Sequence, residues 1–239
     1  MNKIIDKIER NGNDFIDTIL KPMVKCSKDI LLNDSKVAQS YLSFKTAFME
    51  NKLSQYLEFI NNNHNEEILV FIETLTNKEK DFFIETINKV IDLDDSLQIY
   101  IMAYLTKRYK KNSELNYYEK QLFYNINTLS EDDFNIFFCM YKENITKNKN
   151  SMYVQYAYKN KEIIEISLNK FSNIGLLKLK TNITNDKKDN INSSIRYYTT
   201  DYSKHLFQCL NIYFDNKICD KLLEKEKKHG IKELNLKFF

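Results

Sequence analysis

The sequence predicts a mainly α fold with one β-hairpin near its carboxyl end. Only three glycines and one proline occur in 239 residues, whereas β-rich folds need many of both in their turns. Over most of the chain, apolar residues recur at three- and four-residue intervals, as they do between Phe82 and Ile91. Hydrophobic residues make up 43% of the chain, which at this length is enough to bury a core.

The first 145 residues are expected to form a helical, bundle-like region. Two helices are predicted before about Leu32, and Pro22 falls inside the second of them, where it should kink the helix or mark a boundary. A third helix is predicted from Ser35 through Phe48. Its apolar spacing continues to Ile60, before an asparagine-rich run.

Capping signals divide the middle of the chain. Thr76 and Glu79 have capping-box spacing, and Ser130 and Asp133 form a weaker version. The acidic stretch 91–95 reads as a helix start, and 108–115 reads as a short connection. We therefore expect about four helices in hairpin-like succession between residues 66 and 142.

The polar stretch 141–153 is the best candidate boundary, so we predict a helical region at 1–145 and a second module at 151–239. Gly175 fits the left-handed position that ends a helix. The second module is expected to contain two helices, two strands joined by a long loop, and a further helix: Met152–Tyr158, Lys161–Ser172, Leu176–Thr181, Ser194–Thr199 and Tyr202–Phe214. Two helices followed by a β-wing is the plan of a winged-helix module.

The same region resembles the bacterial abortive-infection alpha (Abi-alpha) family. In that family a helix with a leucine and a Gly-Leu pair precede a short segment with a conserved threonine and phenylalanine. The matching positions here are Leu168, Phe171, Gly175, Leu176, Tyr198, Thr199 and Phe207. The sequence departs from the pattern at Ser203 or Lys204, where a glycine is common, and its wing loop is longer. The resemblance implies phage-defence biology and supplies no catalytic residues.

Net charge and cysteine usage indicate which partners and which cellular compartment to expect. The net charge of +3 arises from 36 basic and 33 acidic residues, too balanced to indicate a polyanion partner by itself. The cysteines are widely separated among apolar neighbours, which predicts reduced, buried thiols and a cytoplasmic protein: Cys26, Cys139, Cys209 and Cys219. Neither a signal peptide nor a membrane-spanning run is expected.

Two regions are candidates for binding nucleic acid or a partner. The first combines cations with tyrosines, a combination that can bind single-stranded nucleic acid: Lys107, Arg108, Lys110, Lys111, Tyr117 and Tyr118. The alternative is that these lysines form a solvated connection between packed helices. The second region is the winged-helix-like module: Lys161, Lys170, Lys187, Lys188 and Arg196. Its predicted helix and wing loop are each locally neutral, which favours a structural or protein-binding wing over DNA binding.

Catalytic and metal-binding motifs are not apparent. The sequence contains no glycine-rich phosphate loop, no G-x-S-x-G and no H-E-x-x-H. His205 and Cys209 lie four residues apart, but two ligands do not make a zinc site. We therefore expect no cofactor, no metal and no enzymatic activity.

The leading hypothesis is a macromolecule-binding protein in phage–host conflict, in defence or counter-defence, that occupies a protein or nucleoprotein partner. One alternative is a winged-helix DNA-binding regulator. Another is RNA or single-strand binding through Lys107–Lys111.

Overall fold

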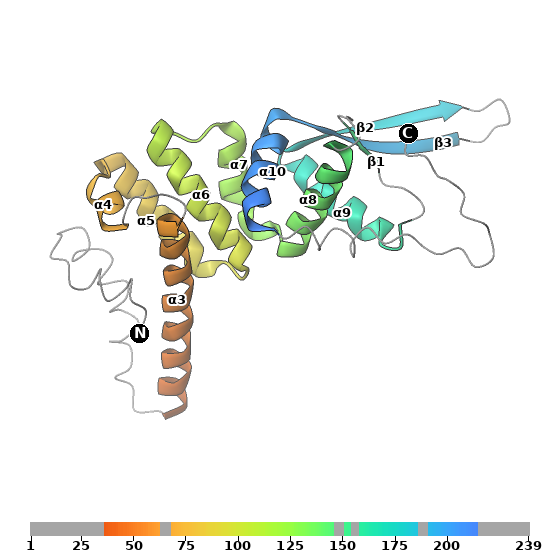
Figure 1. The fold of residues 1–239 in the computed structure, drawn as a ribbon. Helices are drawn as coiled ribbons and strands as arrows, with labels where there is room; N and C mark the ends of the chain where they lie inside the picture. The colour runs from red at the N-terminus through yellow and green to blue at the C-terminus, as the bar shows by residue number, and fades with distance from the viewer. Residues whose placement is uncertain (1–35, 63–67, 146–150, 154–157, 186–190, 215–239) are drawn as a thin grey trace. The chain divides into compact units, whose positions relative to one another are not determined.

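The computed structural model describes residues 36–62, 68–145, 151–153, 158–185 and 191–214. These residues are mainly helical and include a small antiparallel sheet, which confirms the predicted class (Figure 1). The predictions for the first 35 residues, including a kink at Pro22, lie outside the described part. The chain divides into two compact units, Met1–Glu131 and Asp132–Phe239, and each is described by itself.

The described part of the first unit consists of helices. They are α3 (Lys36–Asn62), α4 (Ile68–Glu73), α5 (Asn77–Asp92), α6 (Ser96–Asn112), α7 (Tyr117–Asn125) and the short 3-10 helix η3 (Ile126–Thr128). The predicted capping box opens α5, because Thr76 Oγ1 accepts from the Glu79 amide at 3.4 Å and Glu79 Oε2 accepts from the Thr76 amide at 2.7 Å. Asn116 and Glu119 cap α7 in the same reciprocal way.

Helix α6 is central to the first unit and packs on both α3 and α5. Its apolar residues are buried almost all around the helix: Leu97, Ile99, Ile101, Met102, Ala103 and Leu105. Two polar contacts fix its position within this core. The hydroxyls of Tyr56 on α3 and Thr106 on α6 lie 2.7 Å apart, and the Gln98 amide donates to the Leu129 carbonyl at 2.7 Å. Both contacts are buried, so each satisfies polar groups that would otherwise be costly to dehydrate.

The second unit contains α8 (Glu131–Ile145), β1 (Ser151–Tyr153), α9 (Lys161–Asn173), β2 (Leu177–Asn185), β3 (Ile191–Thr199) and α10 (Asp201–Tyr213). The strands form an antiparallel sheet in the order β1-β3-β2. In Figure 1, β2 and β3 run side by side as a hairpin. Tyr197 of β3 is fully buried, and its hydroxyl donates to Asn169 Oδ1 of α9 at 3.1 Å. This residue therefore links the sheet to α9.

The unit boundary falls one helix earlier than the polar stretch from which it was predicted. Helix α8 belongs with the second unit because its aromatic side chains pack on the later helices. The ring centroids of Phe137 and Phe171 are 4.8 Å apart, and Phe138 stacks on Phe207 at 5.0 Å. A polar linker in the sequence thus follows a helix whose aromatic partners Phe171 and Phe207 are downstream of it.

The predicted helix at Met152–Tyr158 is wrong at its start, where the chain forms β1. Met152 is fully buried and pairs with Tyr197 of β3. This tertiary pairing overrides the local helical spacing. The remaining predicted elements are present: α9 ends before Gly175, which has a φ of 79°, and the two predicted strands extend farther toward the loop than expected. A glycine tolerates this left-handed conformation without a Cβ clash.

Candidate functional site

The predicted cluster at Lys107–Lys111 lies in the last turns of α6, not in a connection between helices. Lys107 Nζ donates to the Phe59 carbonyl at 3.0 Å, and Lys110 Nζ donates to Thr74 Oγ1 at 2.7 Å and approaches the Phe71 carbonyl at 3.4 Å. Phe59 and Phe71 lie in the last turns of α3 and α4, where carbonyls have no partner within the helix.

A third lysine acts in the same way in this unit. Lys52 is 6% exposed, and its Nζ donates to the Ile91 carbonyl in the last turn of α5 at 2.9 Å. A cation at the carboxyl end of a helix also interacts favourably with the helix dipole. Lysines 52, 107 and 110 therefore stabilise helix ends, a role that sequence spacing does not reveal because the partners are 36 to 48 residues away.

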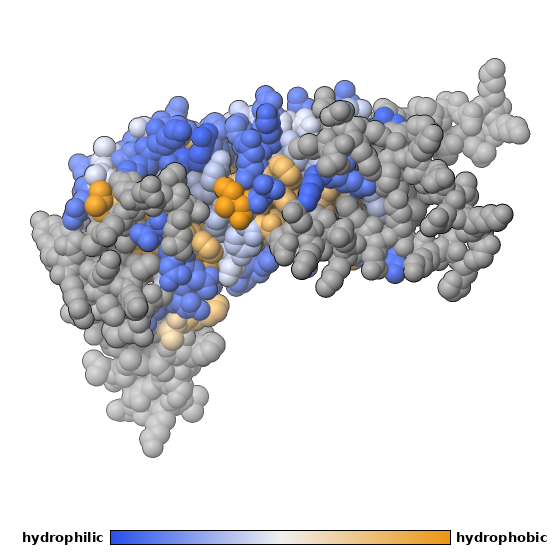
Figure 2. Space-filling model, in the orientation of Figure 1, coloured by the Kyte–Doolittle hydropathy of each residue, from blue (hydrophilic) through white to orange (hydrophobic). Residues whose placement is uncertain are grey.

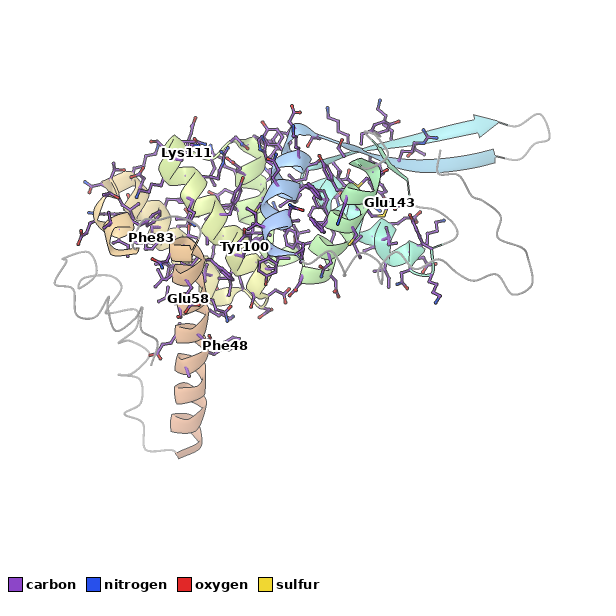
Figure 3. All side chains as sticks on the ribbon, in the orientation of Figure 1. Phe48, Glu58, Phe83, Tyr100, Lys111 and Glu143 are labelled. Carbon is purple, nitrogen blue, oxygen red and sulfur yellow. The ribbon has the colours of Figure 1, made fainter. Side chains whose placement is uncertain are left out.

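Arg108 is engaged within the first unit as well. Its Nε lies 2.8 Å from Glu119 Oε1, and this hydrogen bond raises the pKa of the guanidinium above its ordinary value. Tyr117 is 65% exposed and meets Tyr118 edge to face at 5.3 Å. Lys111 is exposed at the end of α6, where Figure 3 labels it. Most cations of this cluster therefore hold α6 against its neighbours through intramolecular contacts. These contacts make the cluster a weaker candidate for binding nucleic acid.

In the second unit, the predicted lysines of α9 are also paired. Lys161 Nζ lies 3.7 Å from Glu165 Oε1, and Lys170 Nζ lies 2.6 Å from Asp133 Oδ2 on α8. Asp133 is buried and accepts a second hydrogen bond from Ser167 Oγ at 2.6 Å. The predicted cap residue Asp133 thus joins α8 to α9.

The outer surface of α9 exposes two isoleucines. Ile163 and Ile166 are 58% and 59% exposed, although the same helix buries Ile164 and Phe171. Residues three apart on a helix are neighbours, so the two side chains form one small apolar surface. Glu162, next to Ile163, is exposed too. On the face drawn in Figure 2, the visible apolar residues of the described part appear as a few separate patches.

The β-sheet carries a second surface, which includes the predicted residue Arg196. Cross-strand register pairs Lys178 with Tyr198 and Lys180 with Arg196, so these four side chains project from one face of the sheet. Lys178 and Lys180 are exposed, and Lys180 Nζ lies 5.1 Å above the Tyr198 ring. The other face bears the buried Met152 and Tyr197. Lys187 and Lys188 lie outside the described residues.

The structure places His205 and Cys209, the two potential ligands four residues apart in the sequence, in different surroundings. His205 is exposed whereas Cys209 is buried, and the described residues contain no group of three His, Cys, Asp or Glu side chains suited to a metal ion. Cys209 is buried and forms no disulfide, whereas Cys139 is disulfide-bonded, which corrects the expectation of reduced thiols throughout. None of the described helices is long and apolar enough to cross a membrane.

Of the residues that form the two surfaces of the second unit, the sequence analysis singled out only Arg196, although each surface had a signal. The alternation in "LKLK" (177–180) places Lys178 and Lys180 on one face of a strand, and Arg196 and Tyr198 alternate in the same way. The apolar run of α9 includes more isoleucines than one buried stripe needs. Assigning the sheet surface required the strand register, and assigning the α9 surface required knowing which side of that helix packs inward.

No protein-family model, curated protein or solved structure matches the chain. The similarity to the Abi-alpha family therefore stays a prediction from the sequence. Of the positions that carry it, Leu168, Phe171 and Leu176 belong to the buried core of the second unit, and Gly175 ends α9. Packing accounts for the first three positions, and the left-handed backbone accounts for Gly175.

Proposed function

We propose that the chain is a non-enzymatic macromolecule-binding protein that occupies a protein partner through its second unit, a winged-helix-like module. The order α8-β1-α9-β2-β3 and the sheet order β1-β3-β2 support the module assignment, since they place a β-hairpin directly after a surface helix. The helix expected before α9 is replaced at its start by β1. The proposal also treats the helices of the first unit as a bundle-like region.

The observation that carries the proposal is the exposure of Ile163 and Ile166 on α9. Burying a whole isoleucine side chain contributes about 1.5 to 3 kcal/mol. Because more than half of each side chain is exposed, covering both would contribute about 2 to 3 kcal/mol to binding. Helices that dock through apolar anchors three or four residues apart are a recurring mode of protein recognition.

A protein partner agrees with α9 better than duplex DNA does. A helix that enters a major groove commonly presents arginine, lysine, asparagine or glutamine to the bases. Here Lys161 and Lys170 are held by carboxylates, and the exposed surface presents Glu162 beside the isoleucines. An acid near the phosphates would oppose the electrostatic part of DNA binding. The DNA-regulator alternative therefore ranks second.

The biological setting forms a separate part of the proposal. A role in phage–host conflict rests on the Abi-alpha resemblance, and no contact in the structure bears on it. A cytoplasmic location fits that role. The disulfide at Cys139 does not favour it, because stable disulfides are rare in the reducing cytosol.

Affinity capture with the full chain tests the protein-binding role. Tagged wild-type protein, Ile163→Asp/Ile166→Asp and Ile212→Asp would be used to capture partners from phage-infected and uninfected bacterial cells, with and without nuclease. Ile212 is a matched control because it is 74% exposed on another helix of the same unit. We expect to capture a partner protein that is still recovered after nuclease treatment. Wild type and Ile212→Asp should recover equal amounts of it. The double variant should recover at least about tenfold less, since a loss of about 2 to 3 kcal/mol in binding free energy corresponds to 30-fold or more in affinity.

Three results would contradict the proposal. Equal recovery by the double variant would remove α9 as the binding surface. Loss of every partner on nuclease treatment would show tethering by nucleic acid instead of a protein contact. Nuclease, nucleotidase or transferase turnover by the pure protein would contradict the non-enzymatic assignment. Circular dichroism of each variant separates loss of binding from loss of folding.

A further inference from the structure

The outward face of the β-sheet gathers positive charge. Lys178, Lys180 and Arg196 project from the same side as Tyr198, and none of the four residues at these paired positions is acidic. Alternate residues of a strand are about 7 Å apart, and directly opposite residues are about 5 Å apart. The cations therefore lie within one compact area, in which Lys178 and Lys180 are exposed and Arg196 is partly buried.

This arrangement works against the stability of the sheet. Lys180 and Arg196 are directly opposite each other in the register, and like charges at opposite positions destabilise an antiparallel pair. Among the described residues, no carboxylate lies within ion-pair distance of Lys178 or Lys180. The lysines of α9, by contrast, each have a carboxylate partner. A bound anion would offset the repulsion between Lys178 and Lys180.

We propose that this face, formed by Lys178, Lys180, Arg196 and Tyr198, binds the phosphodiester backbone of single-stranded nucleic acid. Cations along an exposed strand can follow a phosphate chain, and an aromatic ring among them offers a surface for one base. Tyr198 is partly exposed, and the Lys180 ammonium above its ring adds a cation to the same surface. The site is separate from the Ile163 and Ile166 surface, so it stands independently of the proposed protein partner.

A single strand agrees with this surface better than a duplex. Tight duplex binding by a winged helix needs its surface helix in a groove, and the cations of α9 are already paired with Glu165 and Asp133. An extended strand needs only the sheet face. The four described side chains offer no hydrogen-bonding pocket for a particular base, so we expect little sequence preference.

Fluorescence anisotropy of the full chain with labelled oligonucleotides tests the assignment. The probes are 12-nucleotide oligo(U), oligo(dT) of the same length, and a 12-base-pair duplex, each at 50 and 200 mM salt. We expect both single strands to bind more tightly than the duplex. Each phosphate contact on a single strand contributes a salt slope of about 0.7, so two lysines contribute about 1.4. A fourfold rise in salt should therefore weaken wild type about sevenfold more than Lys178→Gln/Lys180→Gln.

Matched variants keep the test specific. Lys111→Gln/Lys204→Gln removes two exposed lysines elsewhere and changes net charge equally, so it should bind as wild type does. Lys178→Arg/Lys180→Arg keeps the charge and should bind, which shows that the face tolerates substitution.

The proposal fails if wild type does not bind either single strand at 50 mM salt, or if Lys178→Gln/Lys180→Gln binds as tightly as wild type. Equal or tighter binding of the duplex would assign the face to double-stranded nucleic acid and also overturn it. Binding to vesicles containing anionic lipid, without binding to the oligonucleotides, would assign the cations to a membrane surface instead.

Discussion

Replacing Asp133 with asparagine is expected to destabilise the second unit by about 2 to 3 kcal/mol. The buried carboxylate accepts hydrogen bonds from Ser167 Oγ and Lys170 Nζ, both at 2.6 Å. Hydrogen bonds to a charged group contribute about 1.5 to 3 kcal/mol each. Asparagine keeps the shape but loses the charge and turns a donor toward one of the two partners. The Lys170 side chain is 40% exposed and can be rehydrated, so the loss should stay below the sum of both bonds.

Urea unfolding followed by circular dichroism measures this loss. For a unit of about 100 residues, the free energy of unfolding changes by about 1 to 3 kcal/mol per molar urea, so the midpoint should fall by about 1 M. Asp132→Asn is the matched control because its carboxylate is exposed one residue away. If Asp133→Asn unfolded within about 0.5 kcal/mol of that control, the contact would not hold α9 on α8 and the reasoning would be refuted.

Three further changes test the local physics. Gly175→Ala should lower the free energy of unfolding by about 1 kcal/mol because the residue has a φ of 79°, and an unchanged urea midpoint would contradict this. Thr76→Ala should cost about 1 kcal/mol by removing the α5 cap, whereas Thr76→Ser should cost little; equal losses in the two variants would argue against capping. Burial, and then the charge of Glu165, raise the pKa of Tyr197 to about 12. The unfolded chain therefore loses this proton first. The free energy of unfolding should therefore fall by about 1.4 kcal/mol per pH unit between pH 10 and 12. The same dependence of this free energy on pH in Tyr197→Phe would refute the prediction.

Local signals in the sequence predicted the elements that depend on neighbouring residues. The capping box at Thr76 and Glu79 opens α5, and Gly175 separates α9 from the hairpin. The three-residue strand β1 was not predictable in this way, since it exists by pairing with β3 some 45 residues later. The domain boundary was displaced for a related reason, because α8 packs on helices that follow the polar stretch.

The candidate sites show the same contrast between features set by neighbouring residues and features set by tertiary packing. A cluster of cations in the sequence does not reveal which carbonyls they reach, so Lys107 and Lys110 were predicted as a surface although they stabilise helix ends. For α9, periodicity predicts a helix but cannot decide which isoleucines face inward, because apolar residues occupy more than one stripe. The exposure of Ile163 and Ile166 follows only from the packing of Ile164 and Phe171.

Hydrogen exchange on the full chain, alone and bound to the captured partner, tests the central claim most directly. We expect amides in α9, between Lys161 and Asn173, to gain protection on binding, and those of α10 around Ile212 not to. Protection confined to α10 or to the first unit, with α9 unchanged, would contradict the claim that the chain binds its partner through the isoleucine surface of α9.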